Sequence, residues 1–125
     1  MTGINRFEDI DAWKEARTLA QQVYSHTDGE RFARDIALRE QIRRALLSIM
    51  ANIAEGFDSG TDREFLRFLR YALRSTSEVQ SHLYVALDRG CIERLGFTES
   101  YEQAVKVKSL LGGFLRYLRA NMKAD

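Results

Sequence analysis

Four arginines in the middle of the chain recur at intervals of four, three and four residues. They are Arg63, Arg67, Arg70 and Arg74, with no lysine or acidic residue in the row. On an α-helix this spacing places the guanidinium groups in one line about 15 Å long. A guanidinium donates paired hydrogen bonds that match a phosphate, so such a row suits phosphates spaced along a nucleic-acid strand. The alternative is a solvated face whose arginines pair with acids on neighbouring turns or subunits.

A second polar row interrupts one of the more apolar segments of the chain, which reads SIMANIAEGF at residues 48–57. At 100° per residue, Arg44, Ser48, Asn52 and Glu55 fall on one stripe of a helix. Exposed helix positions more often carry Glu, Lys or Gln than Ser or Asn, which are poorer helix formers. Since this helix is apolar over most of its girth, we expect a subunit interface or a ligand-binding face here. An ordinary solvated back face is the alternative.

Two further groups extend these predictions. Leu66, Leu73 and Tyr84 exceed what a single bundle core requires and favour association with another chain. A basic row near the end of the chain, Arg116, Arg119 and Lys123, adds candidate nucleic-acid contacts. Cations at that position also complement the negative end of a helix dipole, so capping alone could explain them.

Residues for metal or nucleophilic chemistry are sparse. The only histidines are His26 and His82, and neither follows a glutamate by three residues, as a di-metal helical bundle requires. Cys91 has no histidine nearby in sequence, and the chain has no phosphate-binding glycine loop. The arginine-to-histidine spacings also miss those of small helical ribonucleases. We therefore expect no enzyme activity, no metal and no cofactor.

The composition is that of one ordinary globular domain. The 125 residues are 45% hydrophobic and 30% charged, with a formal net charge of +1. Proline is absent, which favours long uninterrupted helices. The first residues contain no apolar signal-peptide core, and no apolar run approaches the ~20 residues of a membrane span. The expectation is a soluble cytoplasmic protein.

Three clusters of turn-forming residues, at 27–30, 56–60 and 90–96, divide the chain into four helical segments. The first should start near Ile10, with Asp9 or Asp11 as its N-cap, and end at Thr27. The second should run from about Asp35 to Gly56, where the glycine would serve as the C-cap.

The third segment opens with a capping box, Thr61 to Glu64, and should end at Gly90. Its apolar stripe is Phe65, Leu69, Ala72, Thr76, Val79, Leu83 and Ala86. The fourth should begin at Thr98, with a stripe of Tyr101, Ala104, Lys108, Leu111, Leu115, Leu118 and Met122, in which Lys108 is the one break. Apolar spacings that alternate between three and four, with short joints, predict an all-α fold: a single antiparallel up-down-up-down four-helix bundle over residues 1–125.

Three long stretches of the chain carry a resemblance to a known family: FEDIDAWKEARTLAQQVY, QIRRALLSIMANIAEGF and EFLRFLRYALRSTSEVQSHL. They resemble the four-helix-bundle proteins encoded in intervening sequences of bacterial 23S ribosomal RNA genes. Relatives of that family include the accessory variability determinant of diversity-generating retroelements. The most specific match is Arg43, Arg44, Ser48, Asn52 and the following Ile-Ala-Glu-Gly.

The resemblance implies a ring-like homopentamer and carries over no catalytic residues. For the retroelement relatives it implies a basic surface that binds nucleic acid and a partner reverse transcriptase. We therefore expect a non-enzymatic homo-oligomer that binds RNA or DNA as an accessory factor. The alternative is an oligomeric protein-interaction scaffold with no nucleic-acid role.

Overall fold

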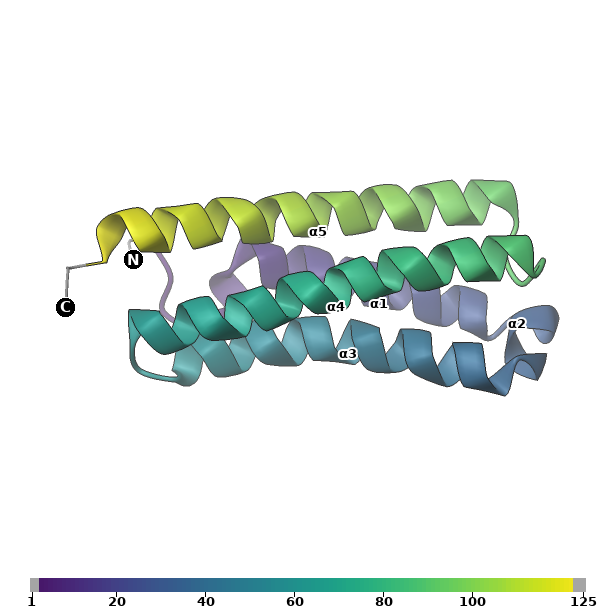
Figure 1. The fold of residues 1–125 in the computed structure, drawn as a ribbon, viewed down its shortest axis with the longest axis horizontal. Helices are drawn as coiled ribbons and strands as arrows, with labels where there is room; N and C mark the ends of the chain where they lie inside the picture. The colour runs from purple at the N-terminus through teal and green to yellow at the C-terminus, as the bar shows by residue number, and fades with distance from the viewer. Residues whose placement is uncertain (1–2, 123–125) are drawn as a thin grey trace.

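The computed structural model describes residues 3–122, and all regular structure in that range is helical. A short 3-10 helix, η1 (Phe7–Asp9), precedes α1 (Asp11–Thr27) and a single-turn helix, α2 (Glu30–Arg34). Three long helices follow: α3 (Ile36–Asp58), α4 (Asp62–Asp88) and α5 (Arg94–Asn121). The four long helices lie side by side along the longest axis of the molecule (Figure 1).

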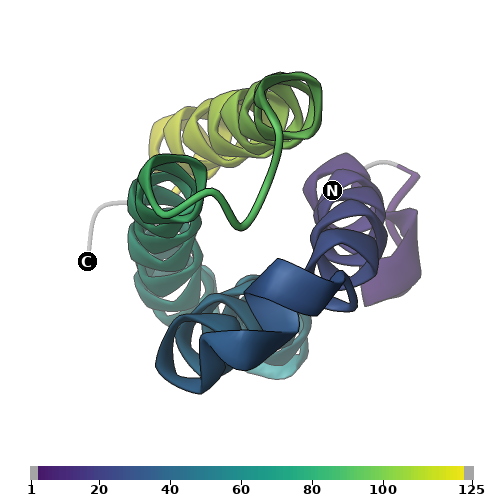
Figure 2. The same cartoon turned by 90° about the vertical axis from the view of Figure 1, so that its right-hand side faces the viewer.

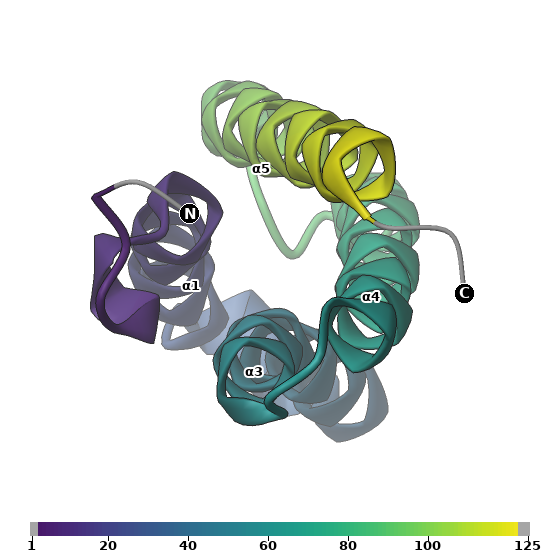
Figure 3. The ribbon, with the colours of Figure 1, turned by 90° about the vertical axis from the view of Figure 1, so that its left-hand side faces the viewer.

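The long helices close a ring around one hydrophobic core. α3 packs against α1 and α4, and α5 packs against the same two helices. Viewed from either end, the four helices surround a common interior (Figures 2 and 3). The α3–α4 joint lies at the end of the molecule where α5 finishes, whereas α2 and the α4–α5 joint lie at the opposite end (Figure 1). The functional candidates therefore fall on the outer faces and at the two ends.

The apolar stripes explain why these helices pack as they do. Every residue of the stripe predicted from Phe65 to Ala86 is buried, and the Leu38-to-Ile53 face of α3 is buried as well. On α5 the stripe is interrupted at Lys108, as predicted. Lys108 is exposed, and Val107 takes the core position beside it with no exposed surface. Lys108 instead extends across the seam to α4, where its Nζ donates to Gln80 Oε1 at 3.4 Å.

Two long helices have a side-chain N-cap, and the one predicted at Thr61 is confirmed. The Asp35 carboxylate accepts a hydrogen bond from Leu38 N at 3.2 Å and caps α3. The Thr61 hydroxyl accepts one from Glu64 N at 3.2 Å and caps α4. The turn after α4 contains Gly90 at a φ of 72°, where a glycine avoids the strain that a side chain would cause.

The predicted N-cap of the first helix and the predicted start of the fourth are wrong. Asp9 accepts a hydrogen bond from Asn5 N, so it closes the turn before α1, and the N-cap of α1 is Ile10 without a side-chain cap bond. α5 begins at Arg94, four residues before Thr98, because its first turn already buries Phe97 against the core. The start of α5 is therefore set by a tertiary contact that no local capping pattern signals.

The predicted helix end at Gly56 is also wrong. α3 continues through this glycine to Asp58, and the residue with positive φ in the joint is Gly60, at 92°. Gly56 is a contact residue between helices. A Cβ built on it would lie 2.7 Å from the Cβ of Phe68 and 2.9 Å from Cδ1 of Phe65. The glycine therefore lets α3 and α4 approach one another, and it does not end the helix.

The helix α2 lies in a segment predicted as a joint. Its anchor is Phe32, which has no exposed surface and joins the core. One buried aromatic side chain holds this single turn across the end of the bundle, between α1 and α3 (Figure 2). The turn brings Arg31 and Arg34 to that end.

Candidate nucleic-acid interface

The arginine row of α4 lies on the outer face of the bundle. Arg63, Arg67, Arg70 and Arg74 are all exposed, and the buried stripe from Phe65 to Ala86 lies on the other side of the same helix. The row predicted from spacing is therefore a surface feature. Arg63 also interacts with other groups of the chain.

Arg67 is the most constrained member of the row. Its Nη2 and Nε donate to Glu64 Oε2 at 2.6 and 3.2 Å, and its Nη1 donates to Tyr71 Oη at 3.2 Å. These contacts, with the Glu64 hydrogen bond the largest cause, raise the pKa of Arg67 above its usual range. The guanidinium remains charged at any physiological pH. An incoming phosphate would compete with Glu64 for its donors.

Aromatic rings are interleaved with these arginines. The Arg67 guanidinium lies 5.2 Å from the ring centre of Phe68 and 5.6 Å from that of Tyr71, and Arg74 lies 5.7 Å from the Tyr71 ring. Both rings are half-buried. Proteins that bind single strands combine cations that contact phosphates with aromatic rings on which bases stack. The spacing of the arginines did not predict this arrangement, although Phe68 and Tyr71 are visible in the sequence.

The basic row on α5 lies at the same end of the bundle as the start of α4. The rings of Phe65 and Phe114 are 5.2 Å apart and join the first turns of α4 to the last turns of α5. Arg116 and Arg119 are exposed. Lys123, the third member of the predicted row, lies outside the described residues. The cations of α4 and α5 thus share one end of the molecule.

The polar stripe on α3 divides into two parts. Ser48 and Asn52 are half-buried, whereas Arg44 and Glu55 are exposed. The hydroxyl groups of Ser48 and Ser75 are 2.8 Å apart, so they share a hydrogen bond between α3 and α4. Asn52 Nδ2 donates to the Ser48 carbonyl at 2.8 Å and to the Ser48 hydroxyl at 3.0 Å.

The stripe is therefore not a uniform outer face. Ser48 and Asn52 use hydrogen bonds to stabilise the seam between two helices of one chain. Ser75, the partner of Ser48, is 9% exposed, and the spacing of the α3 stripe did not predict this contact. Arg44 and Glu55 remain on the surface as candidates for contact with another molecule.

The three apolar residues predicted to promote association differ in their positions. Leu66 is buried in the core of its own chain, with 5% of its surface exposed, so it is not available to another subunit. Leu73 is half-buried and packs against the same core. Tyr84 is 49% exposed, and its ring packs 5.3 Å from that of Tyr101. A hydrogen bond with the Tyr84 side chain raises the pKa of Tyr101.

An exposed apolar side chain lies on the outer face of α3. Leu47 is 55% exposed and lies one turn from Arg44 and Ala51, which are also exposed. Leu46, by contrast, is a core residue. The two leucines differ because the neighbouring helices bury only one of them, and sequence periodicity does not say which.

Other chemistry is not assembled in the described residues. Within residues 3–122 there is no group of three or more His, Cys, Asp or Glu side chains that could hold a metal ion. His82 Nε2 lies 3.2 Å from Glu78 Oε2 one turn earlier on α4, which makes a local surface pair. Among the described helices, none is long and apolar enough to span a membrane.

Comparisons with known proteins agree with the fold. The family model described as 23S rRNA-intervening sequence protein matches residues 8–113. A crystal structure of a protein of unknown function from the S23 ribosomal protein family of Bacteroides thetaiotaomicron superposes with a TM-score of 0.77. The two sequences are 20% identical, and the match covers 84% of this chain and 95% of the other. No curated protein matches the chain.

Proposed function

The chain belongs to the 23S rRNA-intervening sequence protein family, and from that premise we propose that it is a non-enzymatic, homo-oligomeric protein that binds RNA or DNA. In this proposal the helices form an antiparallel up-down-up-down bundle, and the protein acts in the cytoplasm of a bacterium. The observation that carries it is the exposed row on α4, in which the aromatic rings of Phe68 and Tyr71 lie between arginines.

Oligomerisation would give such a surface its affinity. Four cations on one subunit bind a strand weakly at physiological salt. Each phosphate contact releases counterions from the strand, and this release is less favourable when the salt concentration is high. A symmetric ring presents the same row several times, and linked weak sites gain avidity when one strand can reach them together. We propose a homopentamer that acts as an accessory factor, with a reverse transcriptase as a candidate protein partner.

A second function has its own observation. Arg67 is already paired with Glu64 at 2.6 Å, and Leu47 exposes an apolar surface on a different helix. Together these features suit an oligomeric protein-interaction scaffold in which the arginines form ion pairs and bind no nucleic acid. The two proposals differ in what reversal of the arginine charges should do.

The decisive experiment measures fluorescence anisotropy of labelled single-stranded RNA across a range of salt concentrations. We expect an affinity that falls steeply with salt, with a logarithmic slope of about −0.7 for each phosphate contact. A slope steeper than roughly −3 exceeds what the four α4 arginines of one subunit can give, and would identify the oligomer as the binding unit.

Variants separate the two proposals. Arg67→Glu with Arg70→Glu should abolish RNA binding and leave assembly unchanged if the row binds nucleic acid. The matched control is Arg17→Glu with Arg94→Glu, which makes the same charge change at exposed positions away from the row. If the native protein binds no RNA at low salt, the nucleic-acid proposal fails. Loss of the oligomer in the α4 variant would favour the scaffold.

A further inference from the structure

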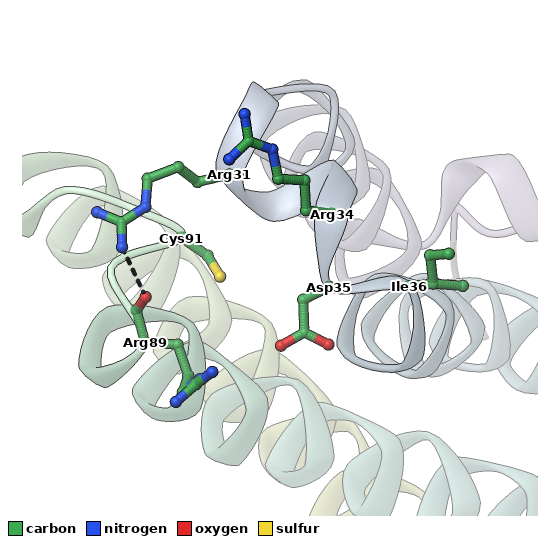
Figure 4. Close-up of a pocket in the computed structure, with 6 residues that line it drawn as sticks. All are labelled: Arg31, Arg34, Asp35, Ile36, Arg89 and Cys91. Carbon is green, nitrogen blue, oxygen red and sulfur yellow. Dashed lines mark hydrogen bonds between the residues drawn. The ribbon is translucent and has the colours of Figure 1, made fainter.

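A second cluster of arginines surrounds a hollow at the opposite end of the bundle. The hollow has a volume of about 470 Å³ and lies where α2 meets the α4–α5 joint (Figure 4). Its lining residues are Arg31, Arg34, Asp35, Ile36, Arg89 and Cys91. These come from two parts of the chain more than fifty residues apart, so only the fold creates this cluster.

Arg31 is held in place by the joint that it crosses. Its Nη2 donates to the Arg89 carbonyl at 3.4 Å (Figure 4). Its guanidinium also lies against Gly90, where a Cβ would come within 2.9 Å of Arg31 Cζ. The absence of a side chain at Gly90 therefore makes room for the guanidinium.

The charges of the lining residues do not cancel. Three arginines and one carboxylate, Asp35, line the hollow, and Oδ1 of Asp35 caps α3 through Leu38 N. Arg34 forms an ion pair with Glu30 on the surface. The Arg89 guanidinium has no hydrogen-bond or ion-pair partner among residues 3–122. The hollow therefore has unused donors and a net positive lining.

We propose that this hollow binds a phosphate group with two negative charges, contacted by the guanidinium groups of Arg31 and Arg89. The planar fork of an arginine donates two parallel hydrogen bonds that fit phosphate oxygens, and such charge-assisted bonds are stronger than neutral ones. Arg34 adds positive charge at the rim, and its ion pair with Glu30 can be replaced by one with the ligand. The phosphate belongs to a small molecule or to the end of a larger one.

This site does not depend on the proposed nucleic-acid surface. The α4 row occupies the first half of that helix, whereas Arg89 follows its last residue. Arg89 lies fifteen positions after Arg74, which corresponds to about 22 Å along a helix. Reversal of the charges at Arg67 and Arg70 should consequently leave phosphate binding unchanged, so each proposal can fail without the other.

Isothermal titration with sodium phosphate in dilute buffer tests the site. We expect saturable binding to the native protein, and an affinity lower by about tenfold or more in each of Arg31→Gln and Arg89→Gln, since each removes a charged donor. Arg94→Gln is the matched control: it removes the same charge from an exposed position at this end of the bundle, outside the hollow, and should bind phosphate like the native protein.

Two results would overturn the site: no saturable phosphate binding by the native protein, or equal weakening in all three variants. The second would indicate a general charge effect. Circular dichroism should first establish that the variants are folded. If Arg31→Gln unfolds because its contact with the joint is lost, Arg89→Gln still decides the outcome, since that side chain holds no other part of the fold.

Competition then identifies the source of the phosphate. A short RNA with a 5′-phosphate and the same RNA with a 5′-hydroxyl are compared for their ability to displace inorganic phosphate. Displacement by the phosphorylated strand alone supports the site and assigns it to a strand end. Displacement by pyrophosphate but by neither strand supports the site and assigns it to a small phosphate compound.

Discussion

Gly56 illustrates how much one residue decides at the α3–α4 seam. The two helices come so close there that a Cβ would lie 2.7 Å from the Cβ of Phe68. The neighbouring Ser48–Ser75 hydrogen bond, at 2.8 Å, lies along the same seam. Small and short polar residues are therefore needed on this side of α3, and the segment that looked unusual in sequence is explained by close helix packing.

We expect Gly56→Ala to destabilise the protein by ~1–3 kcal/mol, because overpacking forces Phe65 and Phe68 to move. The cost should exceed the ~1 kcal/mol that alanine gains over glycine inside a helix. The matched control is Gly113→Ala in α5, where the nearest atom to a new Cβ is the end of the Arg116 side chain at 3.9 Å. That variant should be as stable as the native protein or more so.

Urea denaturation followed by circular dichroism measures both free energies of unfolding. If Gly56→Ala and Gly113→Ala changed stability alike, glycine propensity alone would account for the result. The close approach at Gly56 would then have no energetic consequence.

At the scale of the elements, the Glu15 carboxylate on α1 links this helix to two side chains of α5. Gln103 Nε2 donates to the carbonyl and to Oε1 of Glu15, each at 2.9 Å, and Lys106 Nζ lies 3.3 Å from Oε1. These contacts lower the pKa of Glu15, with the Gln103 hydrogen bond as the largest cause. The carboxylate is the form that stabilises the packed helices.

A pH dependence of stability follows from that shift. Glu15 in the unfolded chain titrates near its usual pKa of about 4.3. Because its folded pKa is lower, the stabilisation is fully present above that pH and is lost as the pH falls through the folded pKa. Glu15→Gln should therefore reduce the acid-dependent loss of stability below about pH 4.3.

Chemical denaturation of the native and variant proteins between pH 3 and pH 7 measures this contribution. Gln103→Ala removes the main cause of the shift, so it should reduce the same part of the pH dependence, and the double variant should add little. A Glu15→Gln profile parallel to the native one would contradict the assignment.

For the molecule as a whole, the exposed face of α3 is where we expect a second copy to bind. Leu47 is 55% exposed beside Arg44 and Glu55, which the sequence placed on a candidate interface. Analytical ultracentrifugation should find a particle with five times the 14.4 kDa mass of one chain. Asn52→Leu should also weaken assembly if the seam residues contribute to that interface.

Leu47→Glu should convert the assembly into folded monomers, because a buried unpaired carboxylate is costly in an interface. The matched control is Leu95→Glu, which introduces the same charge at a position that is 71% exposed on α5. Assembly that survives Leu47→Glu would locate the interface on another face. A native protein that sediments as a monomer would exclude the oligomer altogether.

The sequence by itself determined the helical class, the buried stripe of α4, the exposed arginine row and the cap at Thr61. These features depend on helical periodicity or on hydrogen bonds within one turn, so residues close in sequence are enough to specify them. The resemblance to the 23S rRNA-intervening sequence protein family is confirmed by the family model, which matches residues 8–113.

Only the tertiary structure decided what the remaining residues do. Gly56 looked like a helix end because a glycine after an apolar stripe has that role locally, yet its neighbours Phe65 and Phe68 belong to another helix. Leu66 was predicted to contact another chain, but it is buried in the core of its own. The sequence of one helix does not show how much of its surface the neighbouring helices cover. The hollow between Arg31 and Arg89 joins residues 58 positions apart. Contacts between helices depend on their relative placement, which local spacing does not contain.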